Sequence, residues 1–99
     1  MSPSSRVATG VTVHLPAALG LPAIDHRELS VSGDTVAEVI DALEEAHPGM
    51  RFALCLETGA LRPFVNVYVN GVHIRYRQGL ETPTPDGTSI HIFQSVAGG

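Results

Sequence analysis

One segment, Phe64-Val65-Asn66-Val67-Tyr68-Val69-Asn70-Gly71-Val72-His73-Ile74-Arg75-Tyr76-Arg77, alternates apolar and polar residues on both sides of Asn70-Gly71. Asn-Gly is a strong signal for a two-residue type I′ turn. We therefore predict a hairpin of strands 64–69 and 72–77. Such a turn fixes the register and places six side chains on one face, in the pairs Val69–Val72, Val67–Ile74 and Val65–Tyr76. The other face is expected to carry Phe64, Asn66, Tyr68, His73, Arg75 and Arg77.

Three segments before this hairpin have apolar residues at the spacing of a strand or a helix. Residues 11–15 and 28–32 alternate apolar and polar side chains and predict two strands. Gly33-Asp34-Thr35 then introduces a helix that Asp34 or Thr35 can cap, with Glu38 completing a capping box. Four apolar residues recur at helical spacing before Pro48-Gly49 ends the helix, and these are Val36, Val39, Ile40 and Leu43.

The C-terminal half completes the pattern. Residues 50–63 form a mixed connector with room for a short helical turn, a Pro-rich loop covers 82–87, and residues 89–93 predict the last strand. The order is ββαβββ, which predicts an α+β fold with one main helix on a mixed sheet of four to five strands. This order suits the β-grasp (ubiquitin-like) fold, although other α+β topologies share the same count. We expect a flexible segment at 1–10, one domain at 11–96 and a flexible reactive tail at 97–99.

Composition excludes several classes of function. The chain has 99 residues, a net charge of −4 and one cysteine, so a cluster of thiolate ligands or a disulfide framework is excluded. Its acidic, scattered charge argues against nucleic acid as a partner. No apolar run reaches the length of a membrane span, and no signal pattern starts the chain. We expect a cytoplasmic protein that is monomeric alone, with Cys55 as a small buried hydrophobic residue.

Ionisable residues show no pattern of a catalytic or metal centre. His14, His73 and His91 fall in separate predicted strands at solvent-facing positions, and His26 and His47 lie in a loop and at a helix end. No histidine pair has ligand spacing, so no bound metal is expected. The acidic residues of the helix, Glu38, Asp41, Glu44 and Glu45, are interpreted as a solvated face. We expect no enzyme activity, because no nucleophile lies in a pattern with a base.

Three motifs together resemble one family. They are Phe64-Val65-Asn66-Val67-Tyr68-Val69-Asn70-Gly71, then Pro85-Asp86-Gly87-Thr88-Ser89-Ile90-His91-Ile92, then the terminal Val96-Ala97-Gly98-Gly99. The chain resembles the ThiS/MoaD family of ubiquitin-like sulfur carriers over about residues 11–99. Within it, the chain looks most like the actinobacterial, CysO-like carriers of cysteine biosynthesis. Gln94-Ser95 replaces the two prolines of molybdopterin carriers, and thiamine carriers lack the long 48–63 connector.

The resemblance implies a reaction at the last residue. In the family, a ubiquitin-activating-type (MoeB/ThiF-like) enzyme uses ATP to adenylate the terminal carboxylate, here that of Gly99. A sulfur donor then displaces AMP, and the thiocarboxylate carries sulfur to a biosynthetic enzyme. The carrier is thus a protein cosubstrate that binds no cofactor itself, since ATP belongs to the partner. In relatives, a metalloprotease can trim or release the C-terminus.

The tail suits that reaction physically. An α-carboxyl group has a pKa of about 3.3–3.7, so Gly99 carries an unreactive carboxylate that needs activation. Gly98 has no Cβ, so we expect the tail to be narrow enough to enter a closed active site. Val96 and Ala97 are expected to contact the partner.

Aromatic and arginine side chains predict a docking face beside the tail. Phe64, Tyr68, Phe93 and Arg75 are expected to contact the partner, because such groups are preferred anchors of interfaces. Phe93 also matches an aromatic position that contacts the activating enzyme in the molybdopterin branch. The alternative is that the 50–63 connector folds over these aromatics and forms a second small core.

Two other functions remain open from the sequence. The same tail would serve a ubiquitin-like modifier that is attached to proteins through Gly99. The six Lys and Arg residues of the chain are all arginine, so the chain has no side-chain amine to which another copy could be joined. A non-catalytic β-grasp binding module would not need Gly98-Gly99 at all.

Overall fold

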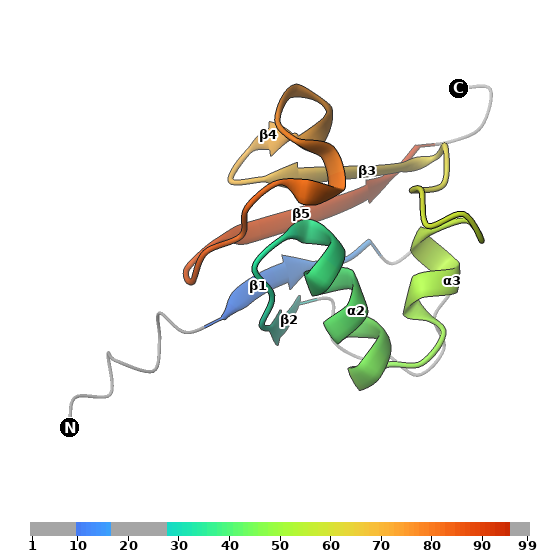
Figure 1. Ribbon diagram of the computed structural model, residues 1–99, viewed down its shortest axis with the longest axis horizontal. Coiled ribbons are helices and arrows are strands. Elements are labelled where there is room, and N and C mark those ends of the chain that lie inside the picture. Colours follow the sequence, from blue (N-terminus) through green and yellow to red (C-terminus); the bar gives the residue numbers. More distant parts are fainter. Residues whose placement is uncertain (1–9, 17–27, 96–99) are drawn as a thin grey trace.

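The computed structural model of the chain describes residues 10–16 and 28–95, which form a mixed sheet with helices on one side (Figure 1). The five strands lie in the order β2-β1-β5-β3-β4. The elements are β1 (Val11–His14), β2 (Glu28–Val31), α2 (Val36–Ala46), α3 (Met50–Leu54), β3 (Val65–Val69), β4 (Val72–His73), the 3₁₀ turns η2 (Ile74–Tyr76) and η3 (Gly79–Glu81), and β5 (Ser89–Gln94). The predicted α+β class, with one main helix on a mixed sheet, is confirmed.

Strand β5 is the centre of the sheet. It pairs in parallel with β1, where Val13 lies opposite Ile90, and antiparallel with β3, where Val67 lies opposite Ile92. β1 also pairs antiparallel with β2. The first and last strands of the chain therefore lie side by side, and β5 makes backbone hydrogen bonds along both edges.

Alternation along the strands sends one set of side chains toward α2 and leaves the other set on the open face of the sheet. The inward set of β1, β3 and β5 joins the apolar side of α2, as the sequence predicts. The buried apolar residues are Val11, Val13, Leu15, Val36, Val39, Ile40, Leu43, Met50, Leu54, Cys55, Val65, Val67, Val69, Ile74, Ile90 and Ile92. The inward position of Cys55 confirms its interpretation as a buried apolar residue.

Helix α2 begins where the capping box predicts. Thr35 is the N-cap, and its hydroxyl accepts the N–H of Glu38 at 3.3 Å. The Glu38 carboxylate returns to accept the N–H of Asp34 at 3.0 Å. The first contact satisfies a backbone donor that the first turn of a helix leaves free, and the second satisfies the N–H of the residue before the N-cap.

The Pro-rich loop holds the start of α2 against the sheet. The Val36 N–H donates to the Thr82 carbonyl at 3.1 Å, and the Thr84 N–H donates to the Asp34 carbonyl at 2.9 Å. The Thr84 hydroxyl is buried and donates to the Gly33 carbonyl at 2.8 Å. These bonds connect residues far apart in the sequence and fix the helix over the sheet.

The second strand of the hairpin is shorter than predicted. Asn70 and Gly71 have φ values of 49° and 87°, which confirms the type I′ turn, and Val69 pairs with Val72. After His73, however, the chain turns into η2, because the His73 ring accepts the N–H of Arg75 at 3.1 Å and caps the turn. Ile74 is still buried, whereas Tyr76 is 75% exposed. The predicted pairs Val67–Ile74 and Val65–Tyr76 are therefore wrong.

The 50–63 connector contains the short helix α3. The Glu44 carboxylate accepts the N–H groups of Gly49 and Arg51, the latter at 2.8 Å, and Arg51 pairs with Asp41. Because Glu38 also caps α2, three of the four acidic residues on this helix hold structure together. The prediction of a merely solvated face missed these contacts.

Several sequence predictions lie outside the described residues. They concern the segment before residue 10, the loop with His26, and the tail Val96–Gly99. The proposed division into 1–10, 11–96 and 97–99 stays a prediction. Within the described ranges, no helix combines the length and apolarity needed to cross a membrane.

Gly33 allows the close approach of β2 and α2. A Cβ there would lie 2.7 Å from the Val39 nitrogen and 2.9 Å from the Glu38 carbonyl carbon. We predict that Gly33→Ala lowers the free energy of unfolding by about 1–3 kcal/mol, a typical cost of overpacking. Urea denaturation measures this free energy, and Ser32→Ala, a change at the exposed neighbouring residue, serves as the control. Equal midpoints for the two variants would contradict this account.

Candidate functional site

The open face of the sheet carries a row of aromatic side chains. The rings of His14 and His91 stack with centroids 4.1 Å apart, and those of His91 and Phe93 lie 6.3 Å apart. Tyr68 meets Phe93 edge-on at 5.6 Å and His73 at 5.0 Å. Tyr76 follows at 6.4 Å from His73. We call these six residues the aromatic row, and they come from β1, β5, β3, β4 and η2.

The row holds two of the predicted docking residues. Phe93 is 51% exposed and Tyr68 is half-buried, so both remain accessible on this face. Phe64, 45% exposed, precedes β3, and Arg75 is exposed in η2 with its guanidinium 5.8 Å from the centre of the Tyr76 ring. Tyr68 and Phe93 belong to the aromatic row, Arg75 lies beside it, and the Phe64 backbone contacts Ser95 after the end of β5; the part of all four in docking stays a prediction.

The connector does not cover these aromatics. Met50 and Leu54 of α3 are fully buried in the core with α2, on the opposite side of the sheet. The alternative expectation, a second small core over Phe64 and Phe93, is therefore wrong. Phe64 and Phe93 stay about half exposed because buried residues of the connector, Met50 and Leu54 among them, pack on the helical side of the sheet.

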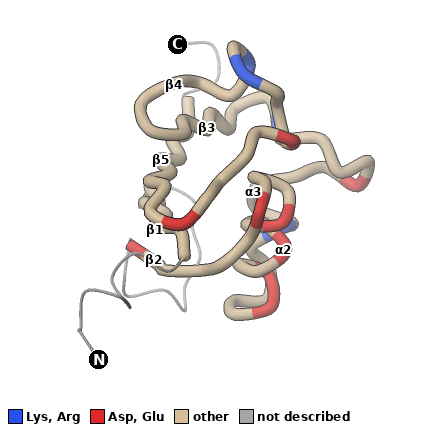
Figure 2. The backbone as a smooth tube through the Cα atoms, turned by 60° about the vertical axis from the view of Figure 1, so that its left-hand side comes forward, with Lys and Arg blue, Asp and Glu red and all other residues tan. Residues whose placement is uncertain are grey.

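Charged side chains are spread unevenly over the described part of the molecule (Figure 2). Figure 2 shows acidic segments along α2 and a basic segment in the turn that follows β4. One carboxylate lies beside the aromatic row. It belongs to Glu28, whose Oε1 is 3.7 Å from Nδ1 of His14. The face thus offers aromatic surface with arginines at one end.

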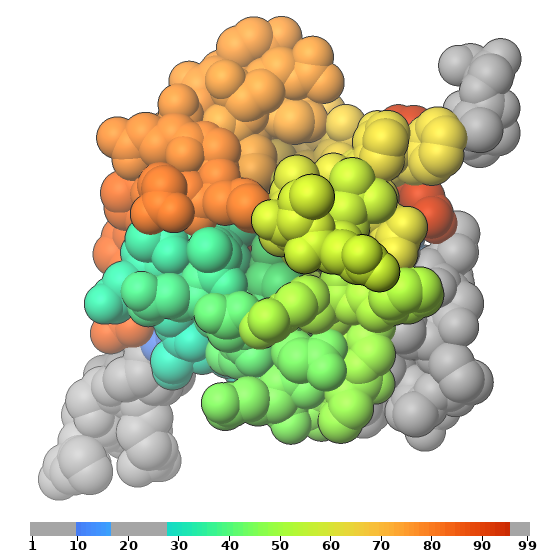
Figure 3. Space-filling view, turned by 45° about the vertical axis from the view of Figure 1, so that its right-hand side comes forward, coloured from blue at the N-terminus to red at the C-terminus, as the bar shows by residue number. Residues whose placement is uncertain are grey.

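The end of β5 is held by side chains of the neighbouring strands. The Ser95 N–H donates to the Phe64 carbonyl at 2.7 Å, and the Ser95 hydroxyl accepts from the amide of Asn66, also at 2.7 Å. Figure 3 shows the end of β5 beside the segment that leads into β3. Burial, and then the charge of Arg75, lower the pKa of His73, whose ring lies 3.1 Å from the Asn66 oxygen.

The start of β5 is held in a similar way. The side-chain oxygen of Asn70 accepts the N–H of Ser89 at 3.0 Å, and the Asn70 N–H donates to the Ser89 carbonyl at 2.8 Å. The two asparagines of the hairpin motif therefore bracket β5, one at each end. The predicted partner-binding residues Val96 and Ala97 and the predicted reactive residues Gly98 and Gly99 follow Ser95 and lie outside the described residues.

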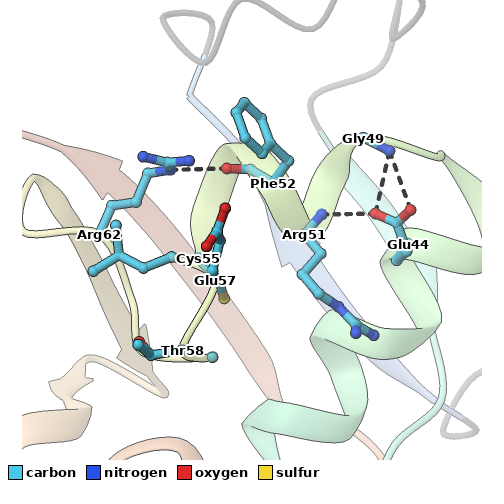
Figure 4. A pocket seen from close by; sticks show the side chains of 10 residues that line it. Glu44, Gly49, Arg51, Phe52, Cys55, Glu57, Thr58 and Arg62 are labelled. Atoms are coloured by element: carbon cyan, nitrogen blue, oxygen red, sulfur yellow. Dashed lines mark hydrogen bonds between the residues drawn. The ribbon is translucent and has the colours of Figure 1, made fainter.

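A shallow pocket lies on the helical side, around the connector (Figure 4). Two of its polar side chains are already bonded, since Glu44 caps α3 and Arg62 donates to the Phe52 carbonyl at 2.8 Å. Burial raises the pKa of the Cys55 thiol, so this residue is a poor nucleophile here. Among residues 10–16 and 28–95, no three His, Cys, Asp or Glu side chains gather as metal ligands.

Sequence reasoning missed several residues of this site. It placed His14 and His91 on the solvent side, but their stacking depends on the parallel pairing of β1 with β5, which no local pattern reveals. It also placed Asn66 on the open face without a partner. The signal that was available is the repeated asparagine at 66 and 70, four residues apart on one strand and its turn.

Comparison with known proteins agrees with this geometry. A model of the ThiS family matches residues 21–99. The sulfur carrier protein CysO of Mycobacterium tuberculosis is 40% identical over 91 residues, which cover 90% of this chain and 98% of that protein. The small archaeal modifier protein 3 of Haloferax volcanii is 37% identical over 65 residues, 66% of this chain and 70% of that protein.

A solved structure of a complex contains a chain with a similar fold. The crystal structure of the BexX/CysO complex of Amycolatopsis orientalis contains a chain that is 38% identical, with a TM-score of 0.81. The match covers 90% of this chain and 99% of that chain. Fold, central β5 and terminal motif thus agree with the family match: this chain belongs to the ThiS family and has its ubiquitin-like β-grasp fold.

Proposed function

We propose that this chain is a sulfur carrier protein whose reactive group is the carboxylate of Gly99. The observation that carries the proposal is the match to CysO across nearly the whole of both chains, together with a family match that extends through residue 99. The chain acts as a protein cosubstrate rather than as an enzyme. It supplies sulfur for cysteine or for another sulfur-containing metabolite, in the cytoplasm where ATP is available.

The proposed chemistry has two steps. A carboxylate oxygen of Gly99 attacks the α-phosphorus of ATP on an E1-like enzyme, and pyrophosphate leaves. Hydrosulfide then attacks the acyl carbon, the bond to the AMP oxygen breaks, and a thiocarboxylate forms as AMP leaves. The carboxylate needs this activation because it is a poor electrophile, and the acyl-adenylate provides a good leaving group.

The structure supports this proposal through the position of β5. Ser95 is held at the edge of the open face, and four residues separate it from the proposed reactive carboxyl group. A chain of that length spans at most about 14 Å at about 3.3–3.6 Å per residue. The aromatic row can therefore bind a partner while the terminal residue enters that partner's active site.

Two kinds of partner follow from the proposal. An E1-like adenylyltransferase must bind the chain to activate Gly99, and a biosynthetic enzyme must bind it to accept sulfur. The BexX/CysO complex shows that a related carrier does form a complex with another protein. A metalloprotease that trims or releases the C-terminus is a third proposed partner.

The tail predicts a graded effect of side-chain size at Gly98. We expect Gly98→Val to abolish ATP–pyrophosphate exchange by the activating enzyme, because a β-branched side chain widens the tail and restricts φ. Gly98→Ala should retain part of the exchange rate. Circular dichroism should show the same melting temperature for both variants as for the natural chain. Normal exchange by Gly98→Val would contradict the proposed role of the tail.

The aromatic row predicts a weaker complex when Phe93 is truncated. Phe93→Ala should raise the KM of the activating enzyme for the carrier by about ten-fold or more, since interface anchors of this type carry about 1.4 kcal/mol or more. Phe52→Ala is the matched control, because Phe52 is 76% exposed but lies on the helical side. Equal KM values for the two variants would contradict docking through this face.

A second candidate function is protein modification through Gly99. The similarity to a small archaeal modifier protein favours it, and adenylation would be the shared first step. Mass spectrometry of proteins purified with a tagged chain distinguishes the two functions. Peptides with lysine joined to Gly99 would support the modifier, whereas a thiocarboxylate without such conjugates supports the carrier.

A further inference from the structure

Three consecutive hydrogen bonds run from η2 to Ser95 across the open face. The Arg75 N–H donates to Nδ1 of His73 at 3.1 Å, and Nε2 of His73 lies 3.1 Å from the side-chain oxygen of Asn66. The Asn66 amide nitrogen then donates to the Ser95 hydroxyl at 2.7 Å. We call these three contacts the Asn66 relay. It connects a turn near residue 75 to the residue that precedes the tail.

The direction of every bond in the relay follows from one backbone group. An N–H can only donate, so Nδ1 of His73 must be the acceptor. The proton of the neutral ring is then on Nε2, which donates to the Asn66 oxygen. This leaves the nitrogen of the Asn66 amide to face Ser95, an orientation assigned from the hydrogen-bond network. A single arrangement therefore satisfies all three side chains.

Ser95 receives a second contact from the same strand segment. Its N–H donates to the Phe64 carbonyl at 2.7 Å, while its hydroxyl is held by Asn66. Residues 64 and 66 thus fix both the backbone and the side chain of Ser95 after β5 has ended at Gln94. The last four residues of the chain start from a point that is held on two sides.

We propose that Asn66, oriented by His73, is a positioning residue for the reaction at Gly99. By fixing Ser95, it sets the direction in which the tail leaves the sheet toward the activating enzyme. This inference rests on the proposed function and assigns to Asn66 a role separate from docking. A misplacement of about 1 Å at a reacting group can cost on the order of a hundred-fold in rate, so a loose origin of the tail matters.

Protonation of His73 opens the relay. A doubly protonated ring carries a hydrogen on Nδ1 and can no longer accept the Arg75 N–H. The groups that face this ring are the charged Arg75, the Tyr68 and Tyr76 rings and the Asn66 amide, with His91 across from Tyr68 in the sheet.

The sign of the pH effect follows from the lowered pKa of His73. Burial first, and the Arg75 charge second, hold this pKa below its ordinary value of 6.5. The neutral ring therefore predominates at pH 6.5 and above, and the relay is lost as the pH falls through the lowered pKa.

Steady-state adenylation kinetics test the positioning role. We expect Asn66→Ala and Ser95→Ala to lower kcat by about ten-fold with KM within about two-fold, because alignment rather than docking is lost. Ser95→Thr keeps the hydroxyl and should restore kcat. Gln94→Ala is the matched control, since Gln94 is the exposed last residue of β5, immediately before Ser95. Unchanged kcat in both alanine variants, or a rise in KM alone, would overturn the inference.

Nuclear magnetic resonance tests the relay in the free protein, without any partner. The Ser95 amide and the Asn66 side-chain amide should titrate together with His73, and Asn66→Ala should lower the heteronuclear Overhauser effect of Ser95. An unchanged Ser95 signal in that variant would overturn the relay even if adenylation occurs. If the natural chain is not adenylated at all while the relay is seen, the proposed function fails and the positioning role fails with it.

Discussion

The pairing of β5 along both of its edges is the constraint on which the rest of the structure depends. Parallel pairing with β1 and antiparallel pairing with β3 join strands from the two halves of the chain in one sheet. Because Ile90 and Ile92 point inward, the same strand contributes to the core under α2. His91 and Phe93, on the other side, form the middle of the aromatic row. The strand that leads to the tail is thus the one that the fold holds most firmly.

The hairpin motif acts on this strand at both ends. Asn70 belongs to the turn, where a positive φ favours Asn or Gly, and it also bonds to Ser89 at the start of β5. Asn66, on the open face, bonds to Ser95 after the end of β5. The Asn66 side chain uses both its acceptor and its donor, toward His73 and Ser95, whereas the Asn70 side-chain oxygen accepts from Ser89 and the Asn70 backbone N–H donates back. The motif therefore shapes the hairpin and holds β5 at both of its ends.

Much of the fold follows from local patterns, and the remainder depends on contacts that no local pattern contains. The capping box at Thr35, the apolar spacing of Val36 to Leu43 and the Asn70-Gly71 turn predict elements that the structure has. The early end of β4 was not predicted, because it results from a bond between the His73 ring and the Arg75 backbone. Likewise, stacking of His14 on His91 requires the parallel register of β1 and β5, which brings together residues 77 positions apart. The role of Gly98 and Gly99 is a prediction from the sequence, whereas the role proposed for Asn66 depends on its contacts with His73 and Ser95.

The central claim is that Gly99 exchanges one carboxyl oxygen for sulfur. The most direct measurement is the intact mass of the chain after incubation with ATP, a cognate activating enzyme and hydrosulfide, followed by fragmentation to locate the change. The account predicts a mass increase equal to the replacement of one oxygen by one sulfur, located at Gly99 and dependent on ATP. A mass that stays unchanged with every cognate activating enzyme, or a sulfur located elsewhere in the chain, would contradict it.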